Sequence, residues 1–259
     1  METQTPVFTD FHAHLDDPLF EPNRFPLIDQ CVREGIDRII TVANPNETGS
    51  FQTTAEMLHY SSHVLAVVGA HPHQADSYSA EIENRILKFL ENRTAIGVGE
   101  VGLDFHYQFA DRQNQINVFQ RQIAIAKEAG LPLVIHSREA ESEILEILNR
   151  EKCTVPVIFH CYTGGIREAE EMTKKGFFIS ISGIVTFKNA NRLREVVQRI
   201  PLANLFTETD SPYLAPEPYR GKPNSPLLVR NVAEKIAAIK NVPLNELTQA
   251  VERNLQSLL

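Results

Sequence analysis

Short apolar runs rich in β-branched residues recur along this chain, and each is followed by a stretch with the spacing of an amphipathic helix. A regular alternation of strand and helix predicts a parallel sheet, because parallel neighbours need a crossover that is usually helical. The clearest helix is expected over residues 113–129, ahead of Gly130 and Pro132. The eight expected strands cover residues 7–11, 38–43, 64–69, 95–99, 131–136, 155–160, 177–182 and 204–209.

Eight strand–helix units within 259 residues predict an α/β protein with one domain, a TIM-type (β/α)8 barrel over residues 1–259. An open doubly wound sheet would normally carry the glycine pattern GxGxxG after its first strand, and none follows residues 7–11. The Pro-rich segment at 211–226 follows the eighth strand, so we expect a long loop there. In such a barrel the active site lies at the carboxyl-terminal ends of the strands.

The charge balance limits which partners the chain can bind. It has 25 Lys and Arg residues against 33 Asp and Glu residues, a formal net charge of -8. A large basic surface for duplex DNA is therefore not expected, and any phosphate site must be local. Bound metal cations could supply that local positive charge without changing the sequence count.

Cysteine use and hydropathy indicate the compartment. Cys31, Cys153 and Cys161 form no paired spacing, so a disulfide framework is not expected. No run approaches the roughly 18 apolar residues of a membrane span, and no basic segment followed by an apolar core begins the chain. We expect a cytoplasmic protein without a membrane segment. The absence of heptads or a long exposed apolar stripe makes a monomer the default expectation.

Chemically active side chains gather at the ends of the expected strands. Six of the nine histidines fall at or just after a strand end, as do three carboxylates. The carboxyl ends of all strands in a barrel meet at one rim, so these side chains are predicted to lie close together. They are His12, His14, His71, His73, Glu100, Asp104, His136, His160 and Asp210.

The spacing of the first two histidines predicts that both point the same way. Strand alternation over Asp10-Phe11-His12-Ala13-His14 directs residues 10, 12 and 14 to one face. Alone, HxH is more often an ordinary histidine pair, but four further residues at equivalent heights on later strands predict a metal site. Imidazoles suit Zn²⁺, and carboxylates also suit Mg²⁺ or Mn²⁺. The predicted ligands are His12, His14, Glu100, His136, His160 and Asp210.

Seven segments, most of them at strand ends, form a specific pattern. They are DFHAHL at 10–15, GAHPH at 69–73, GEVGLDFH at 99–106, LPLVIHSREA at 131–140, FHCYTGG at 159–165, FFISISGIVTFKNA at 177–190 and TETDSPYLAPEPYRGKPNSP at 207–226. With these segments the chain resembles the TatD family of metal-dependent deoxyribonucleases, in the amidohydrolase-like barrel superfamily. The resemblance covers residues 7–254.

The resemblance implies two divalent cations per chain. His12, His14 and Asp210 would bind one, His136 and His160 the other, and Glu100 would bridge them. The segment FHYQFAD after Leu103 departs from the family, in which tyrosines are frequent there. The roles of His106 and Tyr107 therefore stay open.

Other residues in the expected loops are candidates for binding substrate. Loop histidines can contact a leaving group or simply form hydrogen bonds, and exposed Arg and Lys side chains can grip phosphate or merely be solvated. Tyr213, Phe187 and Tyr219 could stack on nucleobases or pack within the loops. Asp104 could orient a ligand histidine or cap a helix. The predicted substrate contacts are His71, His73, Arg138, Tyr213 and Arg220.

The resemblance favours a hydrolase that uses a two-metal-activated water, with Glu100 and Asp210 catalytic and Asp210 as proton acceptor. The first hypothesis is a 3′–5′ exodeoxyribonuclease on single-stranded DNA, or RNA. The alternative is an ester or amide hydrolase, such as a D-aminoacyl-tRNA deacylase with aminoacyl-tRNA as substrate. A non-enzymatic metal-binding or interaction protein is a third hypothesis, although it would require lost ligands.

Overall fold

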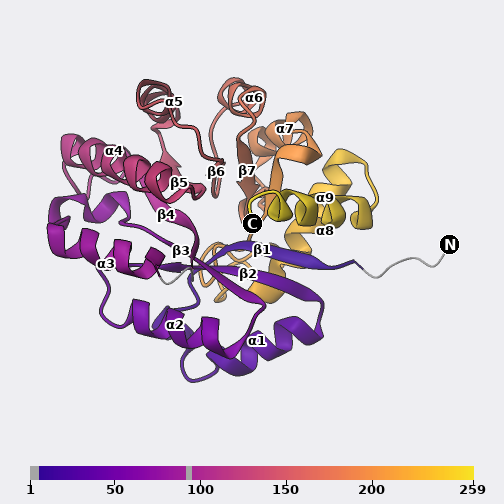
Figure 1. The fold of residues 1–259 in the computed structure, drawn as a ribbon. Coiled ribbons are helices and arrows are strands. Elements are labelled where there is room, and N and C mark those ends of the chain that lie inside the picture. The colour runs from indigo at the N-terminus through magenta and orange to yellow at the C-terminus, as the bar shows by residue number, and fades with distance from the viewer. Residues whose placement is uncertain (1–5, 92–94) are drawn as a thin grey trace.

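Eight parallel strands follow one another around the barrel in chain order, and helices cover its outer surface (Figure 1). The computed structural model describes residues 6–91 and 95–259. The predicted (β/α)8 barrel is confirmed, while residues 1–5 and 92–94 of the domain expected over 1–259 lie outside the described residues. The strands are β1 (Phe8–Ala13), β2 (Ile36–Ala43), β3 (Val64–Val68), β4 (Ala95–Asp104), β5 (Leu133–Arg138), β6 (Val157–Phe159), β7 (Phe178–Ile181) and β8 (Leu205–Thr207).

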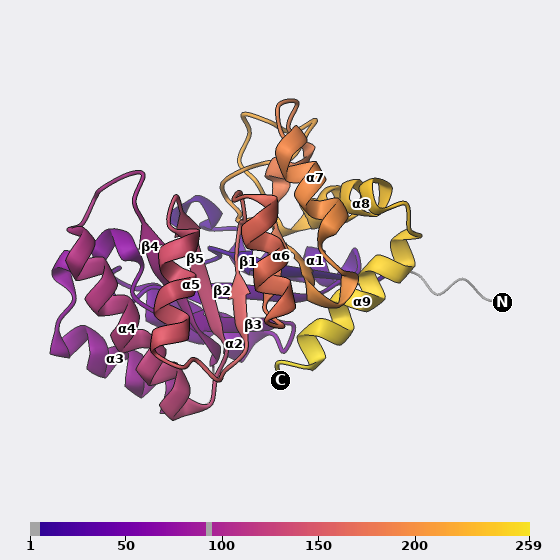
Figure 2. The ribbon, with the colours of Figure 1, turned by 90° about the horizontal axis from the view of Figure 1, so that it is seen from above.

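The helices alternate with the strands, and Figure 2 shows α5, α6 and α7 side by side. The helix expected at 113–129 is confirmed as α4, which begins one residue earlier because Asp111 caps it by accepting from two backbone N–H groups. Gly130 ends it with a positive φ of 67°. The helices are α1 (Arg24–Arg33), α2 (Ser50–Tyr60), α3 (Ala80–Glu91), α4 (Arg112–Ala129), α5 (Glu141–Arg150), α6 (Ile166–Lys174), α7 (Asn191–Arg199), α8 (Val229–Lys240) and α9 (Leu244–Gln256), with 3-10 segments η1 (Pro18–Phe20), η2 (Pro72–Ser77), η3 (Gly183–Thr186), η4 (Leu202–Asn204) and η5 (Pro226–Leu228).

Three strands extend beyond their expected ends: β5 continues to Arg138, and β1 and β4 also lengthen. β1 continues to Ala13, so His12 lies inside the strand, and β4 continues to Asp104, so Glu100 lies inside it as well. Both strands have irregular pairing at these points. The register of β4 against β5 shifts between Gly99 and Val101, and that of β1 against β2 shifts between Asp10 and Ala13. Such irregularities re-aim side chains, and here they occur at predicted ligands.

One end of the barrel is filled by apolar side chains and covered by the last helix. Phe11 of β1 stacks on Phe206 of β8 in the interior, with ring centroids 4.1 Å apart. Val251 and Leu255 of α9 belong to the same cluster, and Asn254 donates to the Leu205 carbonyl at the start of β8 and to the Leu202 carbonyl just before it. Since α9 covers the amino ends of the strands, the carboxyl ends remain for a pocket.

The first and last strands meet through a short seam. Their backbone bridge joins Ala13 to Ser211, with His14 N donating to Ser211 O at 2.7 Å. Below it, the buried Asp10 carboxylate accepts hydrogen bonds from the backbone N–H, at 2.7 Å, and the hydroxyl of Thr209. Asp10 is therefore used in the seam and does not share the surroundings of His12 and His14. The expected alternation over residues 10, 12 and 14 is wrong at Asp10, because of the register shift.

We expect Asp10→Ala to reduce the free energy of unfolding by about 2 to 3 kcal/mol, because it leaves two buried donors of Thr209 without an acceptor. Denaturant unfolding of the metal-free protein would measure this. The matched control is Asp37→Ala, which removes a carboxylate that is 40% exposed. Equal stability of the two variants would contradict a stabilising role for the seam.

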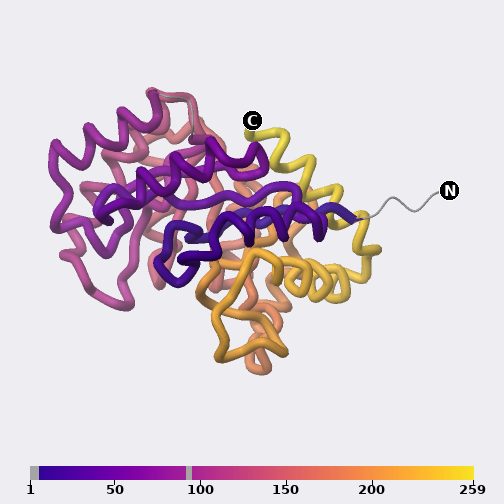
Figure 3. The backbone as a smooth tube through the Cα atoms, turned by 90° about the horizontal axis from the view of Figure 1, so that it is seen from below, coloured from indigo at the N-terminus to yellow at the C-terminus, as the bar shows by residue number. Residues whose placement is uncertain are grey.

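The Pro-rich segment after β8 forms the expected long loop and lies against η3, as Figure 3 shows at the protruding orange edge. Glu217 N donates to the Thr186 hydroxyl at 2.9 Å, and Asn224 donates to the Thr209 and Tyr213 carbonyls. These contacts tie the loop to the barrel. Among the described helices, none is long and apolar enough to cross a membrane.

Candidate metal centre

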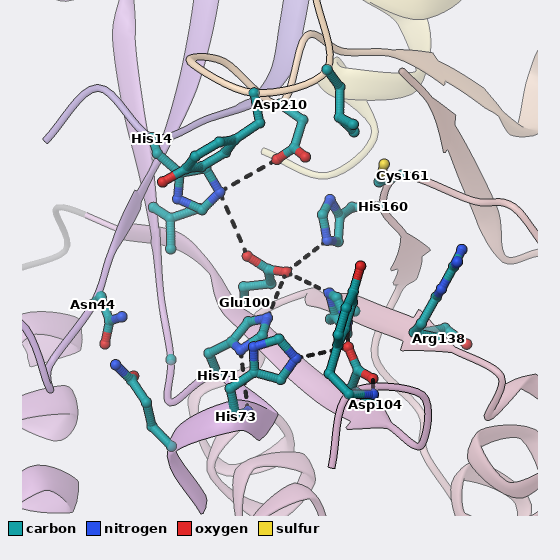
Figure 4. A pocket seen from close by; sticks show the side chains of 18 of the residues that line it. His14, Asn44, His71, His73, Glu100, Asp104, Arg138, His160, Cys161 and Asp210 are labelled. Atoms are coloured by element: carbon teal, nitrogen blue, oxygen red, sulfur yellow. Dashed lines mark hydrogen bonds and ion pairs between the residues drawn. The ribbon is translucent and has the colours of Figure 1, made fainter. Parts of the chain in front are cut away.

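Glu100 occupies the centre of the carboxyl-terminal face, and its two oxygens face different histidine groups (Figure 4). Its side chain is 5% exposed. Oε1 lies 2.7 Å from His160 Nε2 and 2.9 Å from His136 Nδ1. Oε2 lies 3.4 Å from His12 Nε2 and 3.9 Å from His14 Nε2. The structure thus places one carboxylate between two histidine pairs that are contributed by three strands or strand ends.

Asp210 joins the side of the centre that holds His12 and His14. Its Oδ1 lies 3.3 Å from His14 Nε2 and 3.9 Å from His12 Nε2. Its backbone N donates to His12 O at 2.9 Å, which fixes the end of β8 beside β1. Asp210 has a positive φ of 58°, a conformation that L-residues adopt rarely and that here turns the chain out of the strand. The other five predicted ligands therefore gather with Glu100 in one cluster.

The side chains hold one another in defined charge states. Burial alone would raise the pKa of Glu100, but His160 and its neighbours hold it well below the ordinary value. Burial opposes protonation of His14, yet the Asp210 carboxylate raises the pKa of His14 to about 9. Burial lowers the pKa of His12, helped by His160. In the metal-free protein Glu100 is therefore ionised and His12 is neutral, with a free lone pair.

The centre has unsatisfied atoms of the kind that coordinate a cation. His12 is fully buried, and neither of its ring nitrogens has a hydrogen-bond partner among the described residues. Such a group is costly unless something else binds it, and a neutral imidazole beside carboxylate oxygens suits a divalent ion. Groups with all ligand atoms within 4.8 Å are His12–His14–Glu100, Glu100–His136–His160, His12–His160–Glu208 and His71–His73–His136. The residues present fit a metal centre.

Glu208 is a site residue that sequence reasoning missed. It is fully buried, and its Oε1 accepts from Cys161 N at 2.7 Å and lies 3.5 Å from His160 Nδ1. Its Oε2 has no hydrogen-bond partner among the described residues. Glu208 thus lies at the Nδ1 edge of the His160 ring, while the Nε2 edge faces Glu100. A second carboxylate two residues before Asp210, at the end of an apolar strand, was the available signal.

Asp104 contacts two histidines at once. Its Oδ2 lies 3.0 Å from His136 Nε2 and 2.7 Å from His73 Nε2, while Oδ1 accepts from two backbone N–H groups of the following loop. The alternative role as a helix cap is not seen, because Asp111 caps α4. By accepting from Nε2, Asp104 turns His136 Nδ1 toward Glu100. Carboxylates in this position commonly fix the orientation of a ligand histidine.

We expect Asp104→Asn to weaken metal affinity and lower kcat by about 10- to 100-fold. The amide has no negative charge, and it has only one oxygen with which to accept from His136 and His73. Metal titration and steady-state kinetics would measure these effects. Asp111→Asn is the matched control, since Asn caps helices as well as Asp. Unchanged metal affinity in Asp104→Asn would remove the orienting role.

Four of the predicted substrate contacts line a pocket of about 750 Å³ over the centre, namely His71, His73, Arg138 and Tyr213. His71 was predicted only as a substrate contact, but its Nε2 lies 3.2 Å from Glu100 Oε1, within the cluster of predicted metal ligands. Burial lowers the pKa of His71 to about 4, so its ring is neutral. His71 could therefore bind a cation as well as substrate. Arg138 donates from Nη1 to the Thr163 hydroxyl at 3.2 Å.

Arg220 is placed elsewhere. Its guanidinium lies over the Phe187 ring, 3.7 Å from the centroid, and Arg220 is not among the described residues that line the pocket. The cause is the path of the Pro-rich loop, which packs on η3. The structure does not bring Arg220 together with the predicted ligands.

The loop after β4 carries His106 and Tyr107, whose roles the sequence left open, and the structure places them differently. His106 points to Glu139, with Nδ1 2.8 Å from its Oε1, and is 42% exposed. Tyr107 lines the pocket together with Phe109. Sequence reasoning missed Phe109, although an aromatic residue two positions after Tyr107 was the signal. Asn44, Asp16, Asp17 and Glu47 are further lining residues that were not predicted.

Comparisons with known proteins identify the family. The family model described as TatD related DNase matches residues 9–259. The metal-dependent hydrolase YabD of Bacillus subtilis (strain 168) is 36% identical over 250 residues, 96% of this chain and 97% of the relative. The metal-dependent hydrolase YcfH of Escherichia coli (strain K12) is 35% identical over 252 residues, 96% of this chain and 94% of the relative.

A solved structure agrees with the sequence matches. YjjV, a TatD homologue from Escherichia coli K12, superposes with a TM-score of 0.90 and 27% identity, covering 97% of both chains. The family model extends over nearly the whole chain, and the curated relatives share its length. The chain therefore belongs to the family of TatD-related DNases and is a metal-dependent hydrolase.

Proposed function

We propose that this hydrolase is a 3′–5′ exodeoxyribonuclease that acts on single-stranded DNA with two divalent cations. The observation that carries the proposal is the position of Glu100, whose two oxygens face two separate histidine pairs. A carboxylate so placed suits two ions that share it, and two-metal sites are frequent among nucleases and phosphatases. The family description, TatD related DNase, supports the substrate class.

The distances support the division of ligands between two cations that the family resemblance implies. The chemistry that such ions supply when bound is activation of water and neutralisation of charge on the phosphoryl oxygens, by Zn²⁺, Mg²⁺ or Mn²⁺. His12, His14 and Asp210 would hold one ion, His136 and His160 the other, and Glu100 both.

Asp210 is the proposed proton acceptor. Burial would raise its pKa, but the hydrogen bond with His14 holds the pKa below the ordinary value, so the carboxylate is ionised at neutral pH. Asp210 also lines the pocket, where it can take a proton from the attacking water. His71 and His73 also line the pocket, and we propose them as contacts of the substrate there.

The pocket favours a single strand. About 750 Å³ is in the range of pockets for small molecules, which is room for a nucleotide or two and not for a duplex. The net charge of -8 also disfavours a broad duplex-binding surface. A chain end can enter such a pocket more easily than an internal segment, which supports exonuclease action.

The second candidate is a deacylase acting on D-aminoacyl-tRNA. The observation that favours it is a group of three carboxylates, Asp16, Asp17 and Glu47, on one wall of the pocket. An ammonium group of an amino acid would be attracted to these carboxylates, whereas phosphate would be repelled. The same metal centre could serve an ester.

A side-by-side assay tests both functions. Single-stranded DNA labelled at either end, duplex DNA, RNA and D-aminoacyl-tRNA would each be incubated with the protein reconstituted with Mg²⁺, Mn²⁺ or Zn²⁺. We expect stepwise release of nucleotides from the 3′ end of single-stranded DNA. Release of the amino acid without nucleotide release would favour the deacylase. Cleavage of no substrate would favour a binding protein.

A further inference from the structure

We propose that Tyr107 and Phe109, in the loop between β4 and α4, form an aromatic platform on which a nucleobase of the substrate stacks beside the metal centre. The inference rests on the proposed function and deepens it, since it makes the base, as well as the phosphodiester, part of what is recognised. The evidence lies in the exposure, position and anchoring of the two rings and in the charge of the pocket walls.

The two rings are exposed and parallel. Tyr107 is 54% exposed and Phe109 is 66% exposed, yet both line the pocket. Their planes differ by 8° and their centroids lie 5.7 Å apart. Large aromatic side chains left open to water at the edge of a pocket are typical of sites where planar groups stack.

Two histidine rings, His73 and His71, lie between the platform and the metal centre. The Tyr107 and Phe109 rings meet the His73 ring edge to face, at centroid distances of 5.8 Å and 4.8 Å. His73 in turn packs on His71 at 4.3 Å, and His71 Nε2 is 3.2 Å from Glu100 Oε1. Two successive histidine rings therefore connect the platform to Glu100, along the same side of the pocket.

The loop that carries the rings is fastened at both ends. The buried Gln115 side chain donates from Nε2 to Asp104 O at 3.1 Å and to Ala110 O at 3.0 Å. At the start of the loop, Asp104 Oδ1 accepts from the backbone N–H of Tyr107 at 3.0 Å. A loop held in this way presents its rings without much ordering on binding, which favours affinity.

The aromatic residues expected from the sequence to stack are otherwise engaged. The Tyr213 hydroxyl donates to Asp17 Oδ2 at 2.9 Å, and its ring meets His14 edge to face. Phe187 is covered by the guanidinium of Arg220. Tyr219 is exposed but is not among the described residues that line the pocket. Tyr213 is still 51% exposed, but its hydroxyl is bonded to Asp17 on the acidic wall, so Tyr107 and Phe109 are the more exposed rings of the pocket lining.

The charge of the pocket walls directs the strand toward the platform. On the wall formed after β1 and β2 lie the carboxylates of Asp16, Asp17 and Glu47. On the wall after β4 and β5 lie the platform and Arg138, whose buried Nε has no hydrogen-bond partner among the described residues. A polyanion would follow the second wall, where Arg138 can pair with a phosphate.

The test uses single-stranded oligonucleotides in which one position at a time, counted from the 3′ end, is an abasic tetrahydrofuran. The value of kcat/KM is compared for the wild type, Phe109→Leu, Tyr107→Leu and the double variant, with Tyr60→Leu on α2 as the control for removing an exposed tyrosine. We expect the wild type to discriminate against the abasic residue at one position by about tenfold to a hundredfold, in line with base–aromatic stacking. The double variant should lose that discrimination while cleaving the abasic oligonucleotide as the wild type does.

Two further measurements keep the outcome clear. Phe109→Tyr retains an aromatic ring and should retain discrimination against the abasic residue. If residue 109 served only to fold the loop, discrimination would not depend on an aromatic ring there. Fluorescence of 2-aminopurine at the sensitive position should be quenched on binding to the wild type and less so with the double variant. Equal slowing of normal and abasic DNA, or no change at all, overturns the platform and leaves the nuclease standing. If the wild type cleaves no oligonucleotide, the proposed function fails first, and the platform fails as a substrate site with it.

Discussion

Glu100→Gln is expected to lower kcat by about a thousandfold or more, because activation by shared ions supplies several kcal/mol of transition-state stabilisation. The amide keeps the size of the side chain but removes its charge and turns an N–H₂ group toward one of the two histidine pairs. In the native chain Oε1 lies 2.7 Å from His160 Nε2, and Oε2 lies 3.4 Å from His12 Nε2. One side of the centre must therefore lose its oxygen. Metal content, measured by mass spectrometry, should fall together with the rate.

Glu128→Gln is the matched control for this prediction, since Glu128 on α4 is 69% exposed and distant from the pocket lining. It should retain both metal and turnover. A Glu100→Gln protein that binds two ions per chain and keeps the wild-type rate would contradict the role of Glu100 as a shared ligand. Loss of only one ion would show which histidine pair depends on the carboxylate more.

Asp210→Asn is expected to lower kcat by about 10²- to 10⁴-fold, the usual contribution of a positioned base, with any loss of metal adding to it. Asp210 Oδ1 lies 3.3 Å from His14 Nε2, and the carboxylate also faces the pocket. The amide can still coordinate weakly through its oxygen but cannot accept a proton. Turnover and metal content must therefore be measured on the same sample.

The two readouts separate the roles of Asp210. A slow variant that keeps its metal supports the proton-acceptor role, and a slow variant that has lost metal supports a ligand role. Near wild-type turnover with metal bound would remove the base role. Asp29→Asn is the control, since Asp29 is an exposed carboxylate on α1 that pairs with Tyr60 and lies outside the pocket lining.

The sequence was sufficient to predict the barrel and the gathering of the ligands. In a parallel barrel every strand ends at the same rim, so residues such as His136 and Asp210 meet whatever the details of packing. The positions of polar residues at strand ends were therefore enough to predict which side chains lie close together. No similar rule holds for loops, whose path depends on contacts between distant segments.

Three details could not be predicted for that reason. The register shift at Glu100 depends on pairing between β4 and β5, which the β4 sequence alone does not determine. Arg220 stacks on Phe187 because the Pro-rich loop packs on η3, a contact across 33 positions that local sequence does not encode. The burial of Glu208 goes with its contact to the backbone of Cys161, which lies 47 positions away in the sequence.

The seam between β1 and β8 affects when the protein can fold during its synthesis. His12 and His14 leave the ribosome early, but Asp210 and Thr209 emerge only when about four fifths of the chain is made, and Asp10 and Thr209 pair across 199 positions. A nascent chain that ends before Thr209 and Asp210 lacks both the seam and one predicted ligand, so it cannot assemble the whole centre. Long-range closure of this kind is also slow compared with local contacts. Acquisition of metal would then mark the moment at which the barrel has closed.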